Sequence, residues 1–494
     1  MMPEAFTGPL ARLESPLSIP TVRIRPGSSA FEVSLRPPGS KSLTNRAILL
    51  AALARGESTI SHGLLDADDG QAMLGAVRGL GAHVELSASG VLRVRGVDGF
   101  RGVGNEVARA VTDVLDARDA GTVARFLAGA AVLGRSALVV DGSARLRERP
   151  MGPLADVLSK VGARIEYLER VGCVPMRITP PTSRGVPWPT LDLDSSMSSQ
   201  FASALLLIGP WIPGGVTLRL TGEVASASYI SMTLGLLGRL GANVLFSENR
   251  RILRVGPARP TGAHNGARPL GLDGFDLDIE PDASSATFFW AAAALVPGAS
   301  VRILGVSNNS LQGDAGFPQL LERMGATVRT PGSLHANGLV FDLDGADESY
   351  LEITGGPVIR PILADVNDIP DSAVPLAVVA AFASGVSIVR GVRTLRVKES
   401  DRIAALGVEL AKIGVRVTHP VSGDDDVMSI TPPAGGVDLS EGAPPVVFDT
   451  HRDHRMAMAL SLVGLRRPNV SISDPASVGK TYPSFWSDFS RLFT

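Results

Sequence analysis

A glycine that ends a helix and begins a strand recurs along this 494-residue chain at nearly constant intervals. Five copies read GLGAHV, KVGARI, RLGANV, RMGATV and KIGVRV, and their glycines lie 81, 79, 84 and 89 residues apart. Glycine after an apolar helical run is a common left-handed helix stop, and the alternating residues that follow predict a strand. A sixth copy falls near the C-terminus, where YPSFWSDFSRLFT predicts a last helix without a following strand. The five glycines are Gly81, Gly162, Gly241, Gly325 and Gly414.

A second marker has the same period. Six segments start with polar residues and continue as nearly all-apolar helices: SKSLTNRAILLAALA, DAGTVARFLAGAAVLG, SSQFASALLLIG, DASSATFFWAAAALVPG, PDSAVPLAVVAAFASG and DHRMAMALSLVGL. Measured from Ser42, Thr122, Ser199, Ser285, Ser372 and His454, the spacings are 80, 77, 86, 87 and 82 residues. A helix that is apolar on every face is buried. Two independent markers with one period predict six α/β repeats rather than chance periodicity in an Ala/Gly-rich chain.

The polar helix starts favour binding of anions. Ser, Thr and Asp cap the free N–H groups of a helix, and each helix start carries a partial positive charge worth roughly 0.3–1 kcal/mol to a nearby anion. If the six starts face one centre, a small polyanion is the expected ligand.

Composition limits the other classes of function. The chain is 45% hydrophobic and 19% charged, with a net charge of −2, so we expect a globular protein of two large domains that binds neither nucleic acid nor anionic membranes. No apolar stretch is long enough to span a bilayer, and the N-terminus does not resemble a signal peptide. The lone Cys173 excludes an internal disulfide, and we expect a cytoplasmic enzyme.

Lysine is rare in this chain, which makes its positions informative. Only five of the 47 basic residues are lysine: Lys41, Lys160, Lys398, Lys412 and Lys480. Positions that keep lysine where arginine is otherwise used can require a compact ammonium with a tunable pKa. For Lys160 and Lys412 we prefer compositional chance. The other three lie within motifs.

Two segments concentrate charge at expected helix starts. In PPGSKSLTNRAILLAALA, Ser40 or Ser42 can cap the helix, and Lys41 and Arg46 lie on its first turns, where they could contact phosphate or carboxylate. The spacing does not fit a P-loop, and alone the segment is more typical of a plain capped helix. In RVKESDRIAAL, Lys398 and Arg402 are four residues apart, which predicts one helical face; a solvated charged face is the alternative.

Together, the segments PGSKS-x-x-NRA, D-A-G-T, SSQF, EPDASSA, IPDSA, VKESDR, DHRMAMA and GKTYP resemble the 5-enolpyruvylshikimate-3-phosphate synthase family, in family order from Gly39 to Phe485. The resemblance implies an α/β fold, a two-domain inside-out α/β barrel with three β-α-β-α-β-β repeats per domain. One domain would combine residues 1–39 with 280–494, and the other would be residues 40–279, with the active site in the cleft between them.

The resemblance also implies a reaction and its residues. The enzyme would transfer the enolpyruvyl group of phosphoenolpyruvate to shikimate-3-phosphate, with Asp371 as base and with Glu399 and Lys41 delivering and returning a proton. Shikimate-3-phosphate would contact Lys41, Ser42, Arg46, Ser198, Ser199, Gln200, Ser226, Tyr229, Asp371, Thr394 and Lys398. Phosphoenolpyruvate would contact Lys41, Gly121, Arg145, Gln200, Arg402, Arg455 and Lys480. We expect no metal, no cofactor and a monomer, open when free because its basic groups repel one another and closing on shikimate-3-phosphate.

Some residues depart from the family pattern. Asp119 stands in place of the usual Asn, Phe126 in place of a frequent Pro, and Thr394 in place of an Asn that contacts shikimate-3-phosphate. Gly121 is compatible with glyphosate as a mimic of phosphoenolpyruvate, and Phe126 leaves sensitivity open. The chain also has an N-terminal extension and apparent insertions near residues 98–115, 172–190 and 247–275, which we interpret as surface loops.

Two rival functions remain at this point. The first is the sister enolpyruvyl transferase that acts on UDP-N-acetylglucosamine, whose familiar form uses a Cys on a mobile loop. Cys173 lies outside any helix-start motif, which favours the shikimate enzyme. The second is a non-catalytic repeat scaffold, but a scaffold has no need of the base and acid expected at Asp371 and Glu399.

Overall fold

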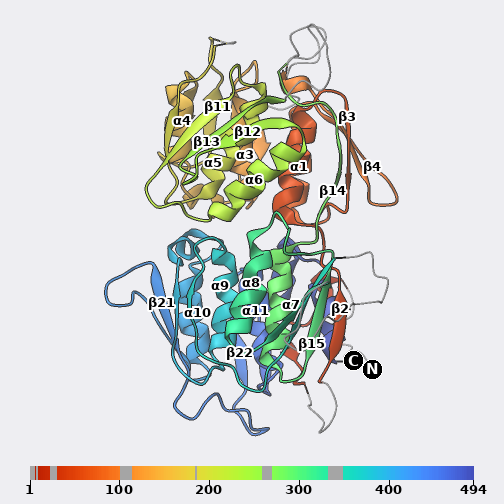
Figure 1. The fold of residues 1–494 in the computed structure, drawn as a ribbon, viewed down its shortest axis with the longest axis vertical. Coiled ribbons are helices and arrows are strands. Elements are labelled where there is room, and N and C mark those ends of the chain that lie inside the picture. Colours follow the sequence, from red (N-terminus) through yellow and green to blue (C-terminus); the bar gives the residue numbers. More distant parts are fainter. Residues whose placement is uncertain are drawn as a thin grey trace. The chain divides into compact units, whose positions relative to one another are not determined.

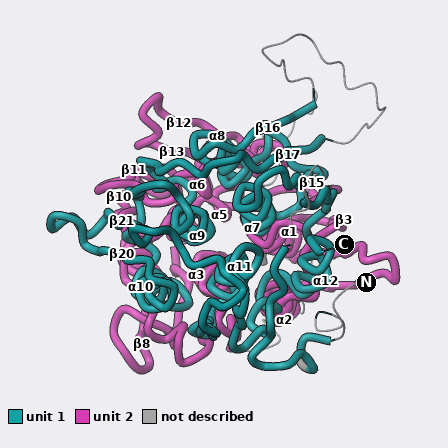
Figure 2. Tube along the Cα trace, turned by 90° about the horizontal axis from the view of Figure 1, so that it is seen from below, with its two compact units in different colours: residues 1–38, 280–494 teal, residues 39–279 magenta. Residues whose placement is uncertain are grey.

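The structure, a computed structural model, describes residues 6, 9–22, 30–100, 114–183, 186–258, 270–331 and 349–493. The chain forms two compact units: unit 1 is Met1–Pro38 with Glu280–Thr494, and unit 2 is Gly39–Ile279 (Figure 2). The chain therefore passes between the units twice. The first crossing lies one residue before the expected boundary, and the second lies at it.

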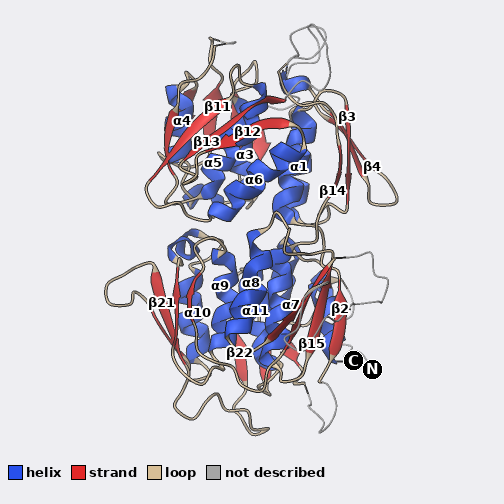
Figure 3. Ribbon diagram, in the orientation of Figure 1, coloured by secondary structure: helices blue, strands red, loops and turns tan. Residues whose placement is uncertain are grey.

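Six helices form the cores of the two units, as their apolar sequences predicted. In unit 1, every residue of α7, α9 and α11 is buried, and Figure 3 shows these helices in the middle of the unit with strands along its sides. In unit 2, α3 and α5 approach closely because Gly129 has no side chain; a Cβ there would lie 2.7 Å from the carbonyl oxygen of Ala204. The six are α1 Lys41–Leu53, α3 Gly121–Ala131, α5 Ser199–Ile208, α7 Ala283–Leu295, α9 Ala373–Ala380 and α11 His454–Gly464.

The glycine helix stops are confirmed. Gly81, Gly162, Gly241, Gly325 and Gly414 have φ values of +95°, +92°, +87°, +109° and +80°, and each is followed by a strand. The helices that precede them are α2 Asp68–Gly79, α4 Gly152–Lys160, α6 Ala227–Arg239, α8 Phe317–Arg323 and α10 Arg402–Ala411. The sixth repeat ends in α12 Phe485–Ser490, and no strand follows it within the described residues.

The three sheets of unit 2 share one topology (Figure 1). Each begins with a parallel pair and continues with two antiparallel pairings. The first sheet has the order β14-β3-β5-β4, with β14 Asp276–Asp278, β3 Glu57–Ser61, β5 Leu92–Arg95 and β4 His83–Leu86. The second is β6-β7-β9-β8, with β6 Val114–Asp116, β7 Leu138–Asp141, β9 Met176–Thr179 and β8 Arg164–Tyr167. The third is β10-β11-β13-β12, with β10 Leu191–Asp194, β11 Val216–Thr221, β13 Ile252–Ala258 and β12 Ala242–Phe246.

Two sheets of unit 1 repeat this pattern, and the third shortens it. They have the orders β2-β15-β17-β16, β18-β19-β21-β20 and β22-β23-β1. The first contains β2 Glu32–Leu35, β15 Ser300–Leu304, β17 Tyr350–Thr354 and β16 Thr327–Arg329. The second contains β18 Leu363–Asp365, β19 Ser387–Arg390, β21 Val427–Thr431 and β20 Arg416–Thr418, and the third contains β22 Val446–Phe448, β23 Val470–Ile472 and β1 Leu17–Ile19.

The two crossings follow from how the parallel pairs are made. Strand β2 stays in unit 1 and pairs with β15, although the chain next enters unit 2. Strand β14 stays in unit 2 and pairs with β3, although the chain next returns to unit 1. Each unit is thus completed by a strand far away in sequence.

The prediction of three inserted surface loops is wrong in part. Strand β9 lies within 172–190 and strand β13 within 247–275. Their alternating apolar residues pair with β7 and β11, so these segments are the final hairpins of their repeats. Residues 101–113, 184–185 and 259–269 of the three segments lie outside the described residues, as does part of the N-terminal extension.

Candidate active site

Side-chain caps occur at four of the six buried helix starts. The acceptors are Ser40 at α1, Ser198 at α5, Asp282 at α7 and Asp453 at α11. Helices α3 and α9 have no side-chain cap, so the predicted capping is wrong there. At α3 the residue before the helix is Ala120, whose side chain has no oxygen that could accept a hydrogen bond.

Arg402 is the centre of the charged cluster in unit 1. Its Nη1 donates to Asp371 Oδ1 at 2.7 Å, its Nη2 to Glu399 Oε2 at 2.9 Å, and its Nε to Asp453 Oδ2 at 2.7 Å. The side chain is 1% exposed, which excludes the solvated-face alternative for this residue. Burial works to lower the pKa of Arg402, but the attraction of Asp453, Glu399 and Asp371 outweighs burial and raises it.

The helical face expected to join Lys398 and Arg402 does not exist. Lys398 ends a short 3-10 helix, Arg393–Val397, and α10 begins only at Arg402. The reason is local: Asp401 caps α10 by accepting from the amide of Ala404 at 3.1 Å. The two cations nevertheless meet, because Lys398 Nζ lies 3.1 Å from the same oxygen, Asp371 Oδ1, that binds Arg402.

Three further cations face the two candidate acid–base carboxylates. Asp371 is approached by Lys398 and, at 3.4 Å, by Nη2 of Arg455; Lys480 Nζ lies 3.2 Å from Glu399 Oε1. Burial would raise the pKa of Asp371, but Arg455, Lys398 and Arg402 hold it well below its usual range. Burial also lowers the pKa of Lys398, against the attraction of Asp371. The expected repulsion among bare basic groups is therefore wrong for unit 1, because carboxylates compensate them.

We expect Asp453→Asn to lower the free energy of unfolding at pH 7 by about 3–5 kcal/mol, because it leaves the buried Arg402 short of one counter-charge. Burial opposes ionisation of Asp453, but Arg402 lowers its pKa overall. A carboxylate with a lowered pKa stabilises the fold above its unfolded value of about 3.9 and loses that contribution as the pH falls below it. Urea unfolding should thus give a difference between variant and wild type that shrinks from pH 7 to pH 3.5. A pH-independent difference would refute this account.

A second buried carboxylate joins two helix starts in unit 1. Asp314 accepts from Ser284 Oγ, on the first turn of α7, at 2.7 Å and from Ser372 Oγ, next to Asp371, at 2.5 Å. Burial raises the pKa of Asp314, although both hydroxyls and Arg455 favour its ionised form. This arrangement fixes the segment that carries Asp371.

Thr394 lies in the 3-10 helix before Lys398 and is buried. Its Oγ1 has no hydrogen-bond partner among the described residues. A threonine is shorter than the Asn of the family pattern, which accounts for a hydroxyl that reaches nothing.

In unit 2, the start of α1 places two cations in different surroundings. Lys41 Nζ lies 3.3 Å from Oδ2 of Asp69, on α2. Arg46 is 2% exposed and, within the described part of the chain, is paired with no carboxylate; its Nε and Nη1 donate to Thr233 Oγ1 at 2.8 Å and to the Ser42 carbonyl at 2.9 Å. The centroid of the Phe126 ring lies 5.1 Å from Cζ of Arg46. Burial lowers the pKa of Arg46 to about 10, as expected of a buried cation that lacks an anion.

Gly121 lies against two guanidinium groups, neither of which belongs to Arg145. A Cβ on Gly121 would lie 2.3 Å from Nη1 of Arg125 and 2.7 Å from Nη1 of Arg149. Arg149 is 8% exposed, and its Nε has no hydrogen-bond partner in the described ranges. Arg145, in contrast, is 38% exposed and pairs with Glu148 at 2.6 Å.

Of the arginines of RLRERP, Arg149 and not the expected Arg145 lies among the nearest neighbours of Gly121. Arg149 directly follows the 3-10 helix Leu146–Glu148 and lies three residues before the start of α4. A role of Arg145 in binding phosphoenolpyruvate stays a prediction.

The remaining polar residues of unit 2 gather at α5 and α6. Ser198 caps α5 through the amide of Gln200, whose Nε2 donates to Thr122 Oγ1 on α3 at 3.1 Å. Ser199 is buried on the first turn of α5. Ser226 precedes α6 with φ +56°, a strained value for a residue other than Gly, and the carbonyl of Tyr229 accepts from Arg46 at 3.2 Å.

Two departures from the family pattern have visible contacts. Asp119 Oδ1 accepts from Ser143 Oγ at 2.9 Å, which ties the segment before α3 to the loop after β7. Phe126 is buried against Arg46, as described above.

Two further observations concern the described residues alone. The described residues contain no group of three or more His, Cys, Asp or Glu side chains placed to hold a metal ion. They also contain no helix long and apolar enough to cross a membrane.

Two α/β units that present cations at the starts of buried helices define a protein suited to binding small polyanions. The family model for EPSP synthase (3-phosphoshikimate 1-carboxyvinyltransferase) matches residues 26–489. The chain belongs to this family.

Individual relatives agree with that assignment. The chain is 36% identical to the 3-phosphoshikimate 1-carboxyvinyltransferase of Vibrio vulnificus (strain YJ016), covering 93% of this chain and 96% of that protein, and 35% identical to that of Shewanella sp. (strain W3-18-1), covering 92% and 95%. The solved EPSP synthase of Acinetobacter baumannii superposes with a TM-score of 0.70 at 28% identity, over 95% and 96% of the two chains. The enolpyruvyl transferase NikO from Streptomyces tendae, at 19% identity, 96% coverage of both chains and a TM-score of 0.63, shares the fold.

Proposed function

We propose that this chain transfers the enolpyruvyl group of phosphoenolpyruvate to the 5-hydroxyl of shikimate-3-phosphate and releases inorganic phosphate, a step of chorismate and aromatic amino-acid biosynthesis. One observation carries the proposal beyond family membership: Asp371 and Glu399 lie in one buried cluster with the cations Lys398, Arg455 and Lys480. The reaction requires this combination, because two anionic substrates must be brought together while protons are removed and delivered.

Shikimate-3-phosphate binds the helix starts of unit 2 and the cluster of unit 1. Arg46 is the best-supported contact, since a buried cation without a carboxylate favours an anionic ligand. The full set is Lys41, Ser42, Arg46, Ser198, Ser199, Gln200, Ser226, Tyr229, Asp371, Thr394 and Lys398.

Phosphoenolpyruvate binds Lys41, Gly121, Gln200, Arg455 and Lys480, with Arg149 in addition to the expected Arg145. Arg125 and Arg149 flank Gly121, where the absence of a side chain lets an anion approach the backbone. Arg402 acts on phosphoenolpyruvate through Asp371 and Glu399, because its own guanidinium is enclosed by carboxylates.

The chemistry is an addition followed by an elimination. The 5-hydroxyl oxygen attacks C2 of phosphoenolpyruvate as its proton passes to Asp371, and C3 accepts a proton from Glu399, with Lys41 assisting. The tetrahedral ketal phosphate then loses a proton from C3 to Glu399 and expels inorganic phosphate. Because arriving phosphate and carboxylate groups compete for Lys398 and Arg455, substrate binding raises the basicity of Asp371.

The wider organisation follows the family. The two units are the halves of an inside-out α/β barrel, each built from three β-α-β-α-β-β repeats, and the site takes residues from both. The units close on shikimate-3-phosphate, and the enzyme is a cytoplasmic monomer that requires neither metal nor cofactor.

The acceptor decides between this function and the sister reaction. With phosphoenolpyruvate present, we expect phosphate release with shikimate-3-phosphate to be at least about 10³-fold faster than with UDP-N-acetylglucosamine, because buried polar groups reject a ligand that leaves them unpaired. Release only with UDP-N-acetylglucosamine would assign the chain to the sister activity. Cys173 is buried, which does not favour the role of the cysteine that the sister enzyme carries on a mobile loop.

A further inference from the structure

Helix α10 carries two buried charged residues on one face. Arg402 and Glu409 are seven residues apart, which is close to two helical turns, so their side chains lie about 10 Å apart along the same side. Both side chains are 1% exposed. The mechanism above uses Arg402 and gives Glu409 no part.

The two residues hold the two ends of one turn, Asp449–Asp453, which leads directly into α11. At the far end, Arg402 binds Asp453 through Nε at 2.7 Å. At the near end, Glu409 Oε2 accepts from the amide of Asp449 at 2.8 Å, and Glu409 Oε1 pairs with Nε2 of His451 at 3.1 Å. One face of α10 therefore spans the whole turn.

This turn is strained. His451 and Arg452 are consecutive residues other than Gly with φ values of +52° and +55°. Such conformations persist only where the surroundings enforce them. The first turn of α11 follows immediately and carries Arg455, which faces Asp371 at 3.4 Å.

We infer that Glu409 is a positioning residue that fixes the Asp449–Asp453 turn and thereby places Arg455 for phosphoenolpyruvate. The inference rests on the proposed function, which gives Arg455 that role. Lys412 Nζ lies 2.6 Å from Glu409 Oε2 and pairs with this buried carboxylate. Glu409 is in neither proposed set of substrate contacts and acts only through the turn.

The test is Glu409→Gln, which keeps the size of the side chain and removes the negative charge that faces the Asp449 amide, His451 and Lys412. We expect KM for phosphoenolpyruvate to rise about 10-fold, because a small misplacement of a binding group has effects of this order. KM for shikimate-3-phosphate should stay within about 2-fold of the wild-type value, because its best-supported contact, Arg46, lies in unit 2 and Arg455 is not among its proposed contacts.

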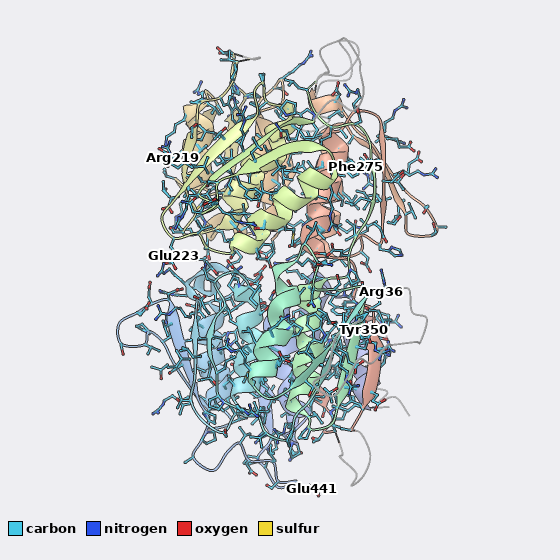
Figure 4. All side chains as sticks on the ribbon, in the orientation of Figure 1. Arg36, Arg219, Glu223, Phe275, Tyr350 and Glu441 are labelled. Carbon is cyan, nitrogen blue, oxygen red and sulfur yellow. The ribbon has the colours of Figure 1, made fainter. Side chains whose placement is uncertain are left out.

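Glu352→Gln is the matched control. Glu352 is also a buried carboxylate, paired with Arg302 at 2.8 Å, but it lies on β17, two residues after Tyr350, whose ring lies against the guanidinium of Arg302 (Figure 4 labels Tyr350). Strand β15, which pairs with β17, lies across unit 1 from α10 (Figure 1). This variant should lose stability like Glu409→Gln and leave both KM values unchanged.

Rescue separates positioning from general damage. Arg452→Gly removes the cost of φ +55° without touching Glu409, so in the Glu409→Gln background it should bring KM for phosphoenolpyruvate back to within about 3-fold of the wild-type value. No rescue, or an equal rise of both KM values in Glu409→Gln alone, would overturn the inference.

Hydrogen exchange tests the same inference without activity. Amides of Asp449–Arg455 should exchange about 10-fold faster in Glu409→Gln and unchanged in Glu352→Gln. A wild-type enzyme that is inactive with phosphoenolpyruvate and shikimate-3-phosphate together would refute the proposed function. Unchanged hydrogen exchange in Glu409→Gln would refute the positioning role by itself.

Discussion

Asp371→Asn should lower kcat by a factor of about 10²–10⁴ while substrate binding changes far less, because the variant keeps the shape of the side chain and loses the base. Asn can still accept from Arg402 Nη1, which now lies 2.7 Å from Asp371 Oδ1, so the cluster should stay assembled. The buried cations lose one counter-charge, and some loss of stability is expected in addition. Steady-state kinetics with both substrates, together with thermal unfolding, separate the two effects.

The matched control for this variant is Asp314→Asn. Asp314 is a buried carboxylate one hydrogen bond away, on Ser372, and burial raises its pKa, so Asn resembles the form that burial favours. We expect its kcat to stay within about 10-fold of the wild-type value. Near-wild-type turnover of Asp371→Asn, or equal losses in the two variants, would remove Asp371 as the base.

Lys41→Arg and Lys480→Arg should each lower kcat/KM by about 10² or more, although the charge is kept. Lys41 Nζ lies 3.3 Å from Asp69, and Lys480 Nζ lies 3.2 Å from Glu399, both largely buried, so a longer, planar guanidinium cannot occupy the same place. Arginine also does not release a proton at neutral pH, which a partner in proton delivery must do. Displacement of a binding group by about 1 Å is enough for an effect of this size.

Lys160→Arg is the control for both lysines. Lys160 is exposed at the end of α4, where only a positive charge near a helix C-terminus is required. It should turn over at the wild-type rate. Equal losses in Lys41→Arg, Lys480→Arg and Lys160→Arg would mean that the scarcity of lysine carries no functional information. Lys412 is a poorer control than its sequence suggested, because it pairs with the buried Glu409.

The repeats could be predicted because their signals are local. A glycine with positive φ after an apolar run needs only its neighbours, and Gly81 and Gly414 adopt the predicted conformation despite different surroundings. The same holds for α7, whose sequence is apolar on every side and whose residues are all buried. Strand β13 escaped prediction because it contains Gly256 and Pro257, which resemble a loop, whereas its pairing with β11 is a long-range contact.

The pairing of charges in the cluster around Arg402 could not be predicted from the sequence. Which carboxylate faces which cation depends on contacts between distant segments, such as Arg402 with Asp453, and no spacing encodes them. For that reason the cluster was expected to be bare and repulsive, and Arg145 was chosen where Arg149 reaches Gly121. The helix starts predicted where charged side chains gather, but not how those charges pair.

The central claim is the transfer itself, and NMR of the products tests it most directly. Phosphoenolpyruvate labelled with ¹³C at C2 is incubated with the protein and one equivalent of shikimate-3-phosphate, and ¹³C and ³¹P spectra are followed together. The account predicts that each inorganic phosphate released is matched by one labelled enol ether on the 5-oxygen of shikimate-3-phosphate, with the 3-phosphate intact. Phosphate release without the enol ether, or labelled phosphoenolpyruvate that persists with shikimate-3-phosphate present, would contradict it.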